Sequence, residues 1–216
     1  MSTLIKLALG LMGQLRPEPA RGDSAPSILL PPPKTRGGMR LLEALSKRQS
    51  SRDFAPDALP LPVLSGLLWA AYGRNRPDGG RTAPSALNAQ EVDLFVALPA
   101  GAYRYSAATH RLDLVAGRDL RRVTGYQDFV DDAPLDLVFV ADHTRMALVP
   151  AGQREAYAYA AAGAISQNVY LYAASTGLST VIRAWIDRDA IADALGLSHD
   201  QQVLLSQTVG YPQDAA

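Results

Sequence analysis

Residues 48–54 read RQSSRDF, and this stretch places Arg48 and Arg52 on either side of Ser50. A guanidinium group offers two parallel hydrogen bonds to a phosphate, and a hydroxyl group adds a further donor. Together with Gln49, these residues therefore form a candidate phosphate-binding loop. A solvated basic loop is the alternative that the seven residues alone leave open.

A short helix is predicted directly before this loop, over residues 39–47. Leu41, Leu42 and Leu45 form one apolar stripe at helical spacing. The loop then begins at the C-terminal end of the helix, where the helix dipole does not attract an anion. The loop side chains must therefore supply the attraction.

The composition limits the classes of protein to which the chain can belong. Its 216 residues suit one large domain or two small ones, and 48% apolar residues are enough for a full core. The formal net charge of zero disfavours a nucleic-acid-binding protein. The absence of cysteine excludes disulfides, thiolate nucleophiles, iron–sulfur clusters and zinc sites with Cys ligands.

The first 38 residues are predicted to form an arm, followed by one domain over residues 39–216. Residues 7–12 after Lys6 resemble the apolar core of a signal peptide, but no clear cleavage site follows them. We interpret them as a short apolar helix, with an export signal as the alternative. Residues 16–38 are rich in proline and glycine, which predicts an extended arm that we expect to lie on a partner subunit.

The rest of the chain alternates between helical and strand patterns. A long helix over residues 153–176 is expected to be buried on all sides; it is rich in alanine and carries Ser166, Gln167 and Asn168, so we do not interpret it as a membrane span. Asp93 is expected on the opposite face of its strand from Val92 and Leu94. The remaining elements are predicted as helices over 60–72 and 190–195 and strands over 91–98, 103–105, 112–114, 135–140, 179–186 and 203–211.

Residues 81–90 read RTAPSALNAQ, a second polar stretch. Ser85 after Pro84 is a candidate N-cap of a helix. Asn88 and Gln90 bring amide donors and acceptors close to this turn, and a flavin ring edge alternates donors and acceptors in a similar way. A capping turn without a ligand is the alternative.

Several common catalytic motifs are absent from the sequence. It contains no G-x-G-x-x-G after a strand, no Walker A loop, no H-E-x-x-H and no G-x-S-x-G. The three histidines are scattered, and the pairs Asp131–Asp132 and Asp142–His143 lack a third ligand at a recognisable spacing. We therefore expect no metal site.

Four stretches in this order resemble the nitroreductase family of FMN-dependent oxidoreductases, and within it the SagB-type dehydrogenases. They are the phosphate-binding motif at 48–54, the flavin-ring loop at 81–90, the segment 163–181, and Val209-Gly210-Tyr211-Pro212. Together they extend from about residue 40 to residue 212. The resemblance implies an α+β sandwich, with a mainly antiparallel sheet between helices, and a homodimer with two FMN sites at its interface.

The resemblance also implies a role for particular residues. Arg48, Ser50 and Arg52 would hold the FMN phosphate, and Ser85 and Asn88 would meet the ring. The backbone of residues 183–184 would approach flavin N5, and Gln127 would reach the flavin of the partner. The full set of implied cofactor-binding residues is Arg48, Gln49, Ser50, Arg52, Pro84, Ser85, Ala86, Asn88, Gln127, Arg183 and Ala184.

The C-terminus departs from the family pattern. Many relatives place a basic residue there beside the phosphate, whereas residues 211–216 read YPQDAA. Arg183 or Arg81 is the expected substitute. The region between the flavin-ring loop and the long helix also lacks a long helical insertion, so the acceptor stays unspecified.

The activity that the resemblance implies is hydride transfer from NAD(P)H through FMN to a nitroaromatic, a quinone or an activated alkene, in a ping-pong cycle. The lack of an acid–base constellation agrees with this, since a bound cofactor carries the chemistry in such enzymes. Two alternatives are oxidation of azoline rings in a modified peptide, as in SagB-type enzymes, and flavin binding without turnover. A cytoplasmic location is expected, or a periplasmic one if residues 1–20 act as an export signal.

Overall fold

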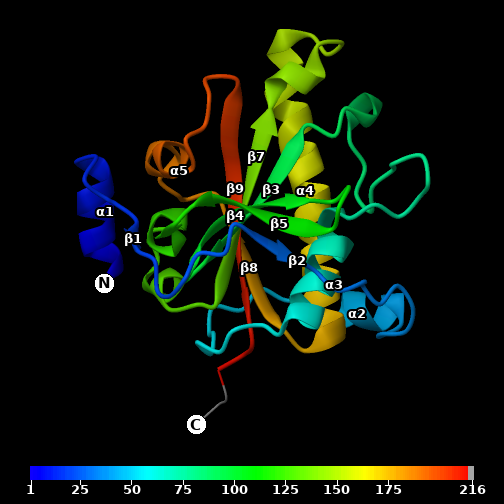
Figure 1. Ribbon diagram of the computed structural model, residues 1–216, viewed down its shortest axis with the longest axis horizontal. Coiled ribbons are helices and arrows are strands. Elements are labelled where there is room, and N and C mark those ends of the chain that lie inside the picture. Colours follow the sequence, from blue (N-terminus) through cyan, green and yellow to red (C-terminus); the bar gives the residue numbers. More distant parts are fainter. Residues whose placement is uncertain (214–216) are drawn as a thin grey trace.

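A seven-stranded antiparallel sheet forms the centre of the chain, whose computed structural model describes residues 1–213 (Figure 1). A separate two-stranded ribbon pairs β1 (Glu18–Pro19) with β6 (Arg118–Asp119). The order in the main sheet is β2 (Ser27–Leu29), β5 (Arg111–Ala116), β4 (Gly101–Ser106), β3 (Val92–Leu98), β7 (Leu135–Asp142), β9 (Gln201–Gly210) and β8 (Ser179–Arg183).

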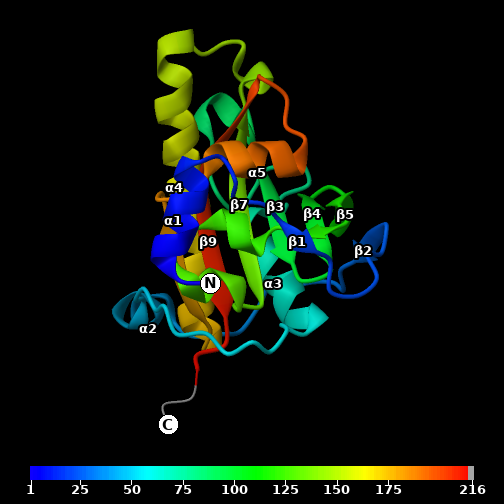
Figure 2. The ribbon, with the colours of Figure 1, turned by 90° about the vertical axis from the view of Figure 1, so that its left-hand side faces the viewer.

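Helices cover both faces of this sheet, as the turned view in Figure 2 shows. One face carries α3 (Leu61–Tyr72) and α4 (Ala151–Thr176), with α2 (Leu41–Lys47) beside α4, and the other carries α1 (Thr3–Leu11) and α5 (Arg188–Leu195). Short 3-10 turns complete the chain at Ala86–Asn88 (η1), Arg121–Thr124 (η2), Asp128–Asp131 (η3) and His143–Met146 (η4). The predicted α+β sandwich with a mainly antiparallel sheet is confirmed.

Because both faces are covered, the central strands bury consecutive residues instead of alternate ones. Leu94 belongs to the core beneath α3 and α4, and its neighbour Phe95 belongs to the core beneath α5. Asp93 is accordingly only 8% exposed, and ion pairs with Arg104 and Arg145 at 2.9 and 2.7 Å compensate its charge. Asp93 lies on the same face as Phe95, opposite Val92 and Leu94 as expected, and that face is buried as well.

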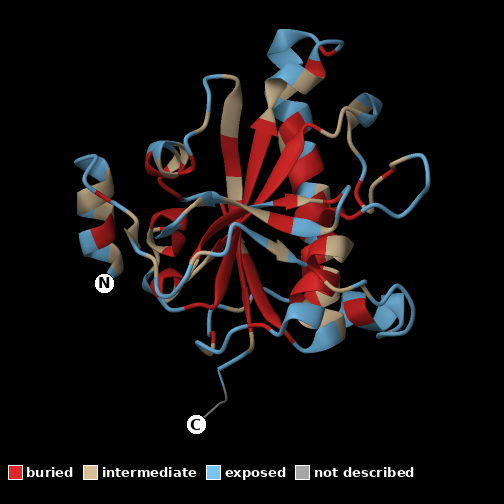
Figure 3. Cartoon of the chain, in the orientation of Figure 1, coloured by how far each residue is buried: buried red, intermediate tan, exposed pale blue. Residues whose placement is uncertain are grey.

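Helix α4 is buried along one face and exposed along the other. The buried face packs on α3 and the sheet, and its residues include Ala162, Ile165 and Val169. We expected burial on all sides, but a single chain leaves the opposite stripe of small and polar residues in solvent, and the first turns of the helix extend beyond the sheet (Figure 3). The exposed stripe comprises Ala156, Ala160, Gly163 and Gln167.

The N-terminal arm packs on its own chain. Strand β2 pairs with β5 at the edge of the sheet, and Leu15 and Leu30 are buried. Lys6 is fully buried as well. A contact of the arm with a partner subunit stays a prediction. The helices within residues 1–213 include none whose length and apolar character would let it cross a membrane.

Candidate functional site

The loop 48–54 runs along the outer side of β8, which is an edge strand of the sheet. The Ser51 amide donates to the carbonyl of Thr180 at 3.0 Å, and the Ala55 amide donates to the carbonyl of Tyr211 at 3.0 Å. Phe54 is buried against Val181 and Ala133. The loop backbone is therefore fixed at its middle and directly after its end, and it covers an edge that would otherwise offer unpaired backbone groups.

Tyr170 of α4 connects this loop to β8. Its hydroxyl lies 2.8 Å from Ser50 Oγ and accepts a hydrogen bond from the Ile182 amide at 3.0 Å. The Arg48 guanidinium lies over the Tyr170 ring, 5.2 Å from the centroid, at a distance suited to a cation–π contact. Within residues 1–213, neither Arg48 nor Arg52 has a carboxylate at ion-pair distance. Two uncompensated cations beside a serine hydroxyl are what an anion-binding loop requires.

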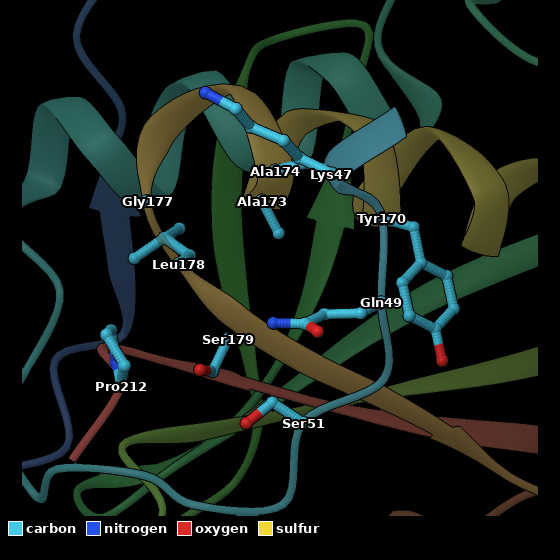
Figure 4. Close-up of a pocket in the computed structure, with 10 residues that line it drawn as sticks. All are labelled: Lys47, Gln49, Ser51, Tyr170, Ala173, Ala174, Gly177, Leu178, Ser179 and Pro212. Carbon is cyan, nitrogen blue, oxygen red and sulfur yellow. The ribbon is translucent and has the colours of Figure 1, made fainter. Parts of the chain in front are cut away.

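Two pockets flank the loop. The smaller pocket, of about 210 Å³, lies between the loop and the C-terminal end of α4, as Figure 4 shows. The larger pocket, of about 830 Å³, contains Arg52. The smaller pocket is lined by Lys47, Gln49, Ser51, Tyr170, Ala173, Ala174, Gly177, Leu178, Ser179 and Pro212, and the larger by Met1, Thr3, Arg52, Asp53, Phe54, Pro56, Gln127, Asp128, Phe129, Asp132 and Gln213.

Gln127 contributes to the larger pocket of its own chain, beside Arg52. Its buried Oε1 has no hydrogen-bond partner within residues 1–213. A buried amide oxygen without a donor is costly, and such atoms are normally paired in native proteins. A bound molecule with an N–H or O–H group would satisfy it.

The side chain of Arg183 is committed elsewhere. It is buried, donates to Asp136 at 2.7 Å and lies over the Phe129 ring at 5.6 Å. Burial lowers the pKa of Arg183, and the charge of Asp136 opposes that shift. Arg183 lines neither pocket, and the role of its guanidinium at a phosphate stays a prediction. The adjoining backbone is more accessible, since Ala184 is exposed.

Arg81, the other expected substitute, is also engaged. Its guanidinium donates to Gln90 Oε1 at 2.8 Å and to the Tyr72 carbonyl at 3.2 Å, and it lies over the Tyr72 ring at 4.9 Å. It lines neither pocket. These bonds fix the start of the loop 81–90, so Arg81 supports that loop, and its expected assistance to Arg48 stays a prediction.

The loop 81–90 has a strained backbone. Leu87, Asn88 and Gln90 have φ values of 54°, 53° and 51°, a region that residues other than glycine rarely occupy. The predicted helix after Ser85 is therefore reduced to one 3-10 turn, and Ser85 Oγ accepts from the Gln90 amide at 2.9 Å instead of capping a helix. Strained, exposed loops of this kind cluster at ligand sites.

Within one chain, the two expected halves of the site stay apart. Arg52 and Gln127 line the larger pocket and Gln49 lines the smaller one, whereas Arg48, Ser50, Pro84, Ser85, Ala86 and Asn88 line neither of the two. Asn168 of α4 donates to the Thr82 carbonyl at 3.3 Å and so holds the loop 81–90 on α4. Leu87 and Asn88 are exposed at its tip, where a second molecule can reach them.

Comparison with known proteins decides the family. The sequence profile described as "Nitroreductase family" matches residues 45–211. The chain belongs to the nitroreductase family. A relative from Methanocaldococcus jannaschii whose name assigns it as a nitroreductase is 32% identical over 162 residues, which are 70% of this chain and 82% of that protein.

Solved structures agree with the nitroreductase fold. A protein from Ralstonia eutropha JMP134, also named as a nitroreductase, is 50% identical, with a TM-score of 0.89 over 93% of this chain and 96% of that chain. The microcin synthetase complex McbBCD of E. coli contains a chain that is 17% identical, with a TM-score of 0.68 over 98% of this chain and 93% of that chain. At that identity the likeness shows the fold alone. Membership of the family supports an oxidoreductase that depends on a flavin.

Sequence reasoning did not find every residue that lines the two pockets. Lys47, Ser51 and Ser179 line the smaller pocket and were not expected. The signal for Ser51 was present, because alternate residues of an extended loop point in opposite directions. Tyr170 could not be distinguished from the other tyrosines of α4, since its role depends on contacts with residues distant in sequence.

Proposed function

We propose that the chain is an FMN-dependent oxidoreductase that passes reducing equivalents from NAD(P)H to a small organic acceptor, such as a nitroaromatic or a quinone. The observation that supports it most is the loop 48–54. It presents Arg48 and Arg52 without carboxylate partners in the described residues, Ser50 lies between them in the sequence, and Arg52 lines the pocket of about 830 Å³. A phosphate monoester attached to a larger group matches that combination of charge and space.

The loop residues fit the phosphate of FMN in chemical type, and of the two arginines Arg52 lines the larger pocket, together with Asp53, Asp128 and Asp132. Arg48, Ser50 and Arg52 would hold the phosphate and the nearby part of the cofactor, and Gln127 would reach the flavin of the partner, in the cleft that the acceptor enters. Bound FMN would supply the redox chemistry, by taking a hydride from NAD(P)H and passing two electrons to the acceptor. The protein binds and orients the reactants and keeps water out, and it needs no nucleophile of its own.

We propose that the working unit is a homodimer. The stripe of Ala156, Ala160, Gly163 and Gln167 on α4 is exposed in the single chain, and its small residues would let a second helix approach closely. Leu41, Leu42 and Leu45 on the neighbouring α2 are exposed too. A second copy over this surface would bury these leucines and bring its own Ser85 and Asn88 toward the pocket.

We also propose a cytoplasmic location. Lys6 and Leu15 are fully buried in contacts with the rest of the chain, so the first residues act as part of the fold. Removal of residues 1–20 by a signal peptidase would expose Asp131 and part of the core beneath α5. Fractionation of cells should find the full-length chain, and a shortened periplasmic form would contradict this location.

Anaerobic reduction tests the activity directly. The purified protein should be yellow or take up added FMN, and NADH or NADPH should bleach the flavin absorbance. A panel of nitroaromatics, quinones and an azoline-containing peptide should then show which acceptor restores the colour. A protein that takes up no FMN would contradict the proposal, and a bound flavin that neither nicotinamide bleaches would indicate a binding protein without turnover.

A further inference from the structure

Helix α1 is attached to the segment of residues 125–131 by a buried lysine. Lys6 is fully buried, and its Nζ donates to Asp131 Oδ1 at 2.6 Å and to the Gln127 carbonyl at 3.0 Å. Burial lowers the pKa of Lys6, and the hydrogen bond to Asp131 opposes that shift. A buried charge of this kind persists only with well-placed partners, so the contact fixes one position of α1 on the segment.

A glycine on the same helix allows a second close contact with this segment. A Cβ atom at Gly10 would lie 2.5 Å from Tyr126 Cε1 and 3.0 Å from Asp187 Oδ2, closer than side-chain contacts permit. Tyr126 in turn packs on Trp185, with the ring centroids 5.5 Å apart. Lys6 and Gly10 therefore hold the outer side of the 125–131 segment at two points, one turn of helix apart.

The inner side of the segment forms a wall of the larger pocket. Gln127 and Phe129 line that pocket, and Thr3 of α1 lines it too. A Cβ at Gly125 would lie 2.7 Å from Arg183 Nη1 and 3.0 Å from Gln127 Oε1, so the segment packs closely on Arg183 at this glycine. Its place is set between Arg183 on one side and α1 on the other.

The chain thus uses a part outside residues 45–211, the extent of the family match, to build one wall of the pocket. We propose that Lys6 is a positioning residue, which fixes the Gln127 carbonyl and the Asp131 carboxylate and thereby sets the pocket wall that the acceptor contacts. This inference rests on the proposed function, because it assumes that the larger pocket takes a substrate. An apolar contact would hold α1 equally well, but it would not fix the backbone of Gln127.

Substitution of Lys6 by methionine tests the inference, because Lys6→Met keeps the apolar stem and removes the charge and both donors. Hydrogen exchange of the backbone amides of residues 124–132 should become roughly tenfold faster, as expected for the loss of one charged hydrogen bond. Amides in β7 and β9 should be unchanged. Lys34→Met is the matched control, since Lys34 is exposed on the arm.

The kinetic constants separate positioning from a role in stability alone. In Lys6→Met the acceptor KM should rise roughly tenfold with kcat retained, whereas a lower amount of folded protein would reduce the apparent kcat and leave KM unchanged. If Lys6→Met does not fold, the double variant with Asp131→Leu also removes the buried carboxylate, which would otherwise keep the Met1 ammonium at 3.2 Å as a partner, and should recover stability but not KM. Arg122, which lies 3.7 Å from Asp131, keeps its pairing with Glu18 in that variant.

Unchanged exchange over residues 124–132 in a folded Lys6→Met protein would overturn the inference, as would a double variant with wild-type KM. A wild-type protein that takes up no FMN would overturn the proposed function instead. The exchange experiment would then still decide whether Lys6 positions the segment, because it needs no cofactor.

Discussion

Tyr170 shows how single side chains prepare the phosphate loop. One hydroxyl contacts Ser50 Oγ and the Ile182 amide, and the ring supports Arg48. The guanidinium is therefore restrained before any ligand arrives, which reduces the ordering cost of binding. The loop residues were recognisable from sequence, but this restraint comes from a helix more than a hundred positions away, and no local pattern predicts it.

Arg48→Ala should weaken FMN binding by about 2–4 kcal/mol, as expected when one partner of a charged, hydrogen-bonded pair is removed. A fluorescence titration with FMN measures the change. Arg36→Ala is the matched control, because Arg36 is exposed on the arm. Equal FMN affinity of the Arg48→Ala protein and the wild type would contradict the assignment of Arg48 to the FMN phosphate.

Glu91 gives the fold a defined pH dependence. Its side chain is fully buried, and neither carboxyl oxygen has a hydrogen-bond partner within residues 1–213. Burial raises the pKa of Glu91, and the charge of Arg145 opposes the shift. The folded chain therefore holds this proton more tightly than the unfolded chain. The resulting stability is complete below the ordinary glutamate pKa and is lost as the pH rises through the raised pKa.

Glu91→Gln should reduce the pH dependence of the free energy of unfolding, because the amide does not ionise. The free energy of unfolding of the wild type should fall as the pH rises above about 4.5, the ordinary pKa of this group, until the raised pKa is passed, by at most about 1.4 kcal/mol per pH unit, and the variant should lack that contribution. Urea unfolding across this range measures it. Asp57→Asn, a change of an exposed carboxylate, should keep the wild-type slope, and a Glu91→Gln protein that also keeps it would refute the assignment.

At the scale of elements, apolar periodicity predicted most of the fold. The helices near 60–72 and 153–176 and the strands that form β3, β4, β5, β7, β8 and β9 all occur close to the expected positions. Strand β2 was not predicted because it has only three residues and lies between Pro26 and Pro31. A short apolar run flanked by prolines is typical of an extended arm. Its pairing with β5 is an edge contact, where flanking prolines are tolerated.

The function of Arg183 and Arg81 could not be predicted for a related reason. Each guanidinium was free to serve a phosphate as far as the sequence shows. The fold places Arg183 against Asp136 and Arg81 against Gln90, and these partners belong to different strands and loops. The choice of partner for a charged side chain depends on tertiary contacts, which cannot be predicted from the spacing of residues in the sequence.

The exposed stripe of α4 leads to a prediction at the same scale. A Cβ at Gly163 meets no atom within 4 Å outside its own helix, so Gly163→Glu should leave the single chain folded. The added charge should break the proposed dimer, since it would be buried at the helix contact. Sedimentation would show this as a shift from dimer to monomer, with circular dichroism confirming the helix content.

Ala108→Glu is the control for that experiment. It adds the same charge at an exposed position of the turn between β4 and β5, away from α4. It should leave the association state unchanged. A Gly163→Glu protein that remains dimeric would place the subunit contact on another surface.

For the whole molecule, the arm is a structural part of the domain. Deletion of residues 1–37 removes β2 together with Leu15 and Leu30, which are 1% and 4% exposed. Loss of these two leucines alone should lower the free energy of unfolding by roughly 3–6 kcal/mol. Deletion of residues 1–13 keeps both leucines and should cost less. Thermal unfolding compares the two, and equal Tm values for the longer deletion and the intact chain would make the arm dispensable.

Sedimentation of the FMN-loaded protein, followed at the flavin absorbance, tests the account most directly. FMN that is held by Arg48 and Arg52 of one chain and by the loop 81–90 of the other should move as a single boundary, at twice the mass of one chain. The stoichiometry should be one FMN per chain. Flavin absorbance that stays behind the protein boundary, or that moves with a single chain, would contradict the account.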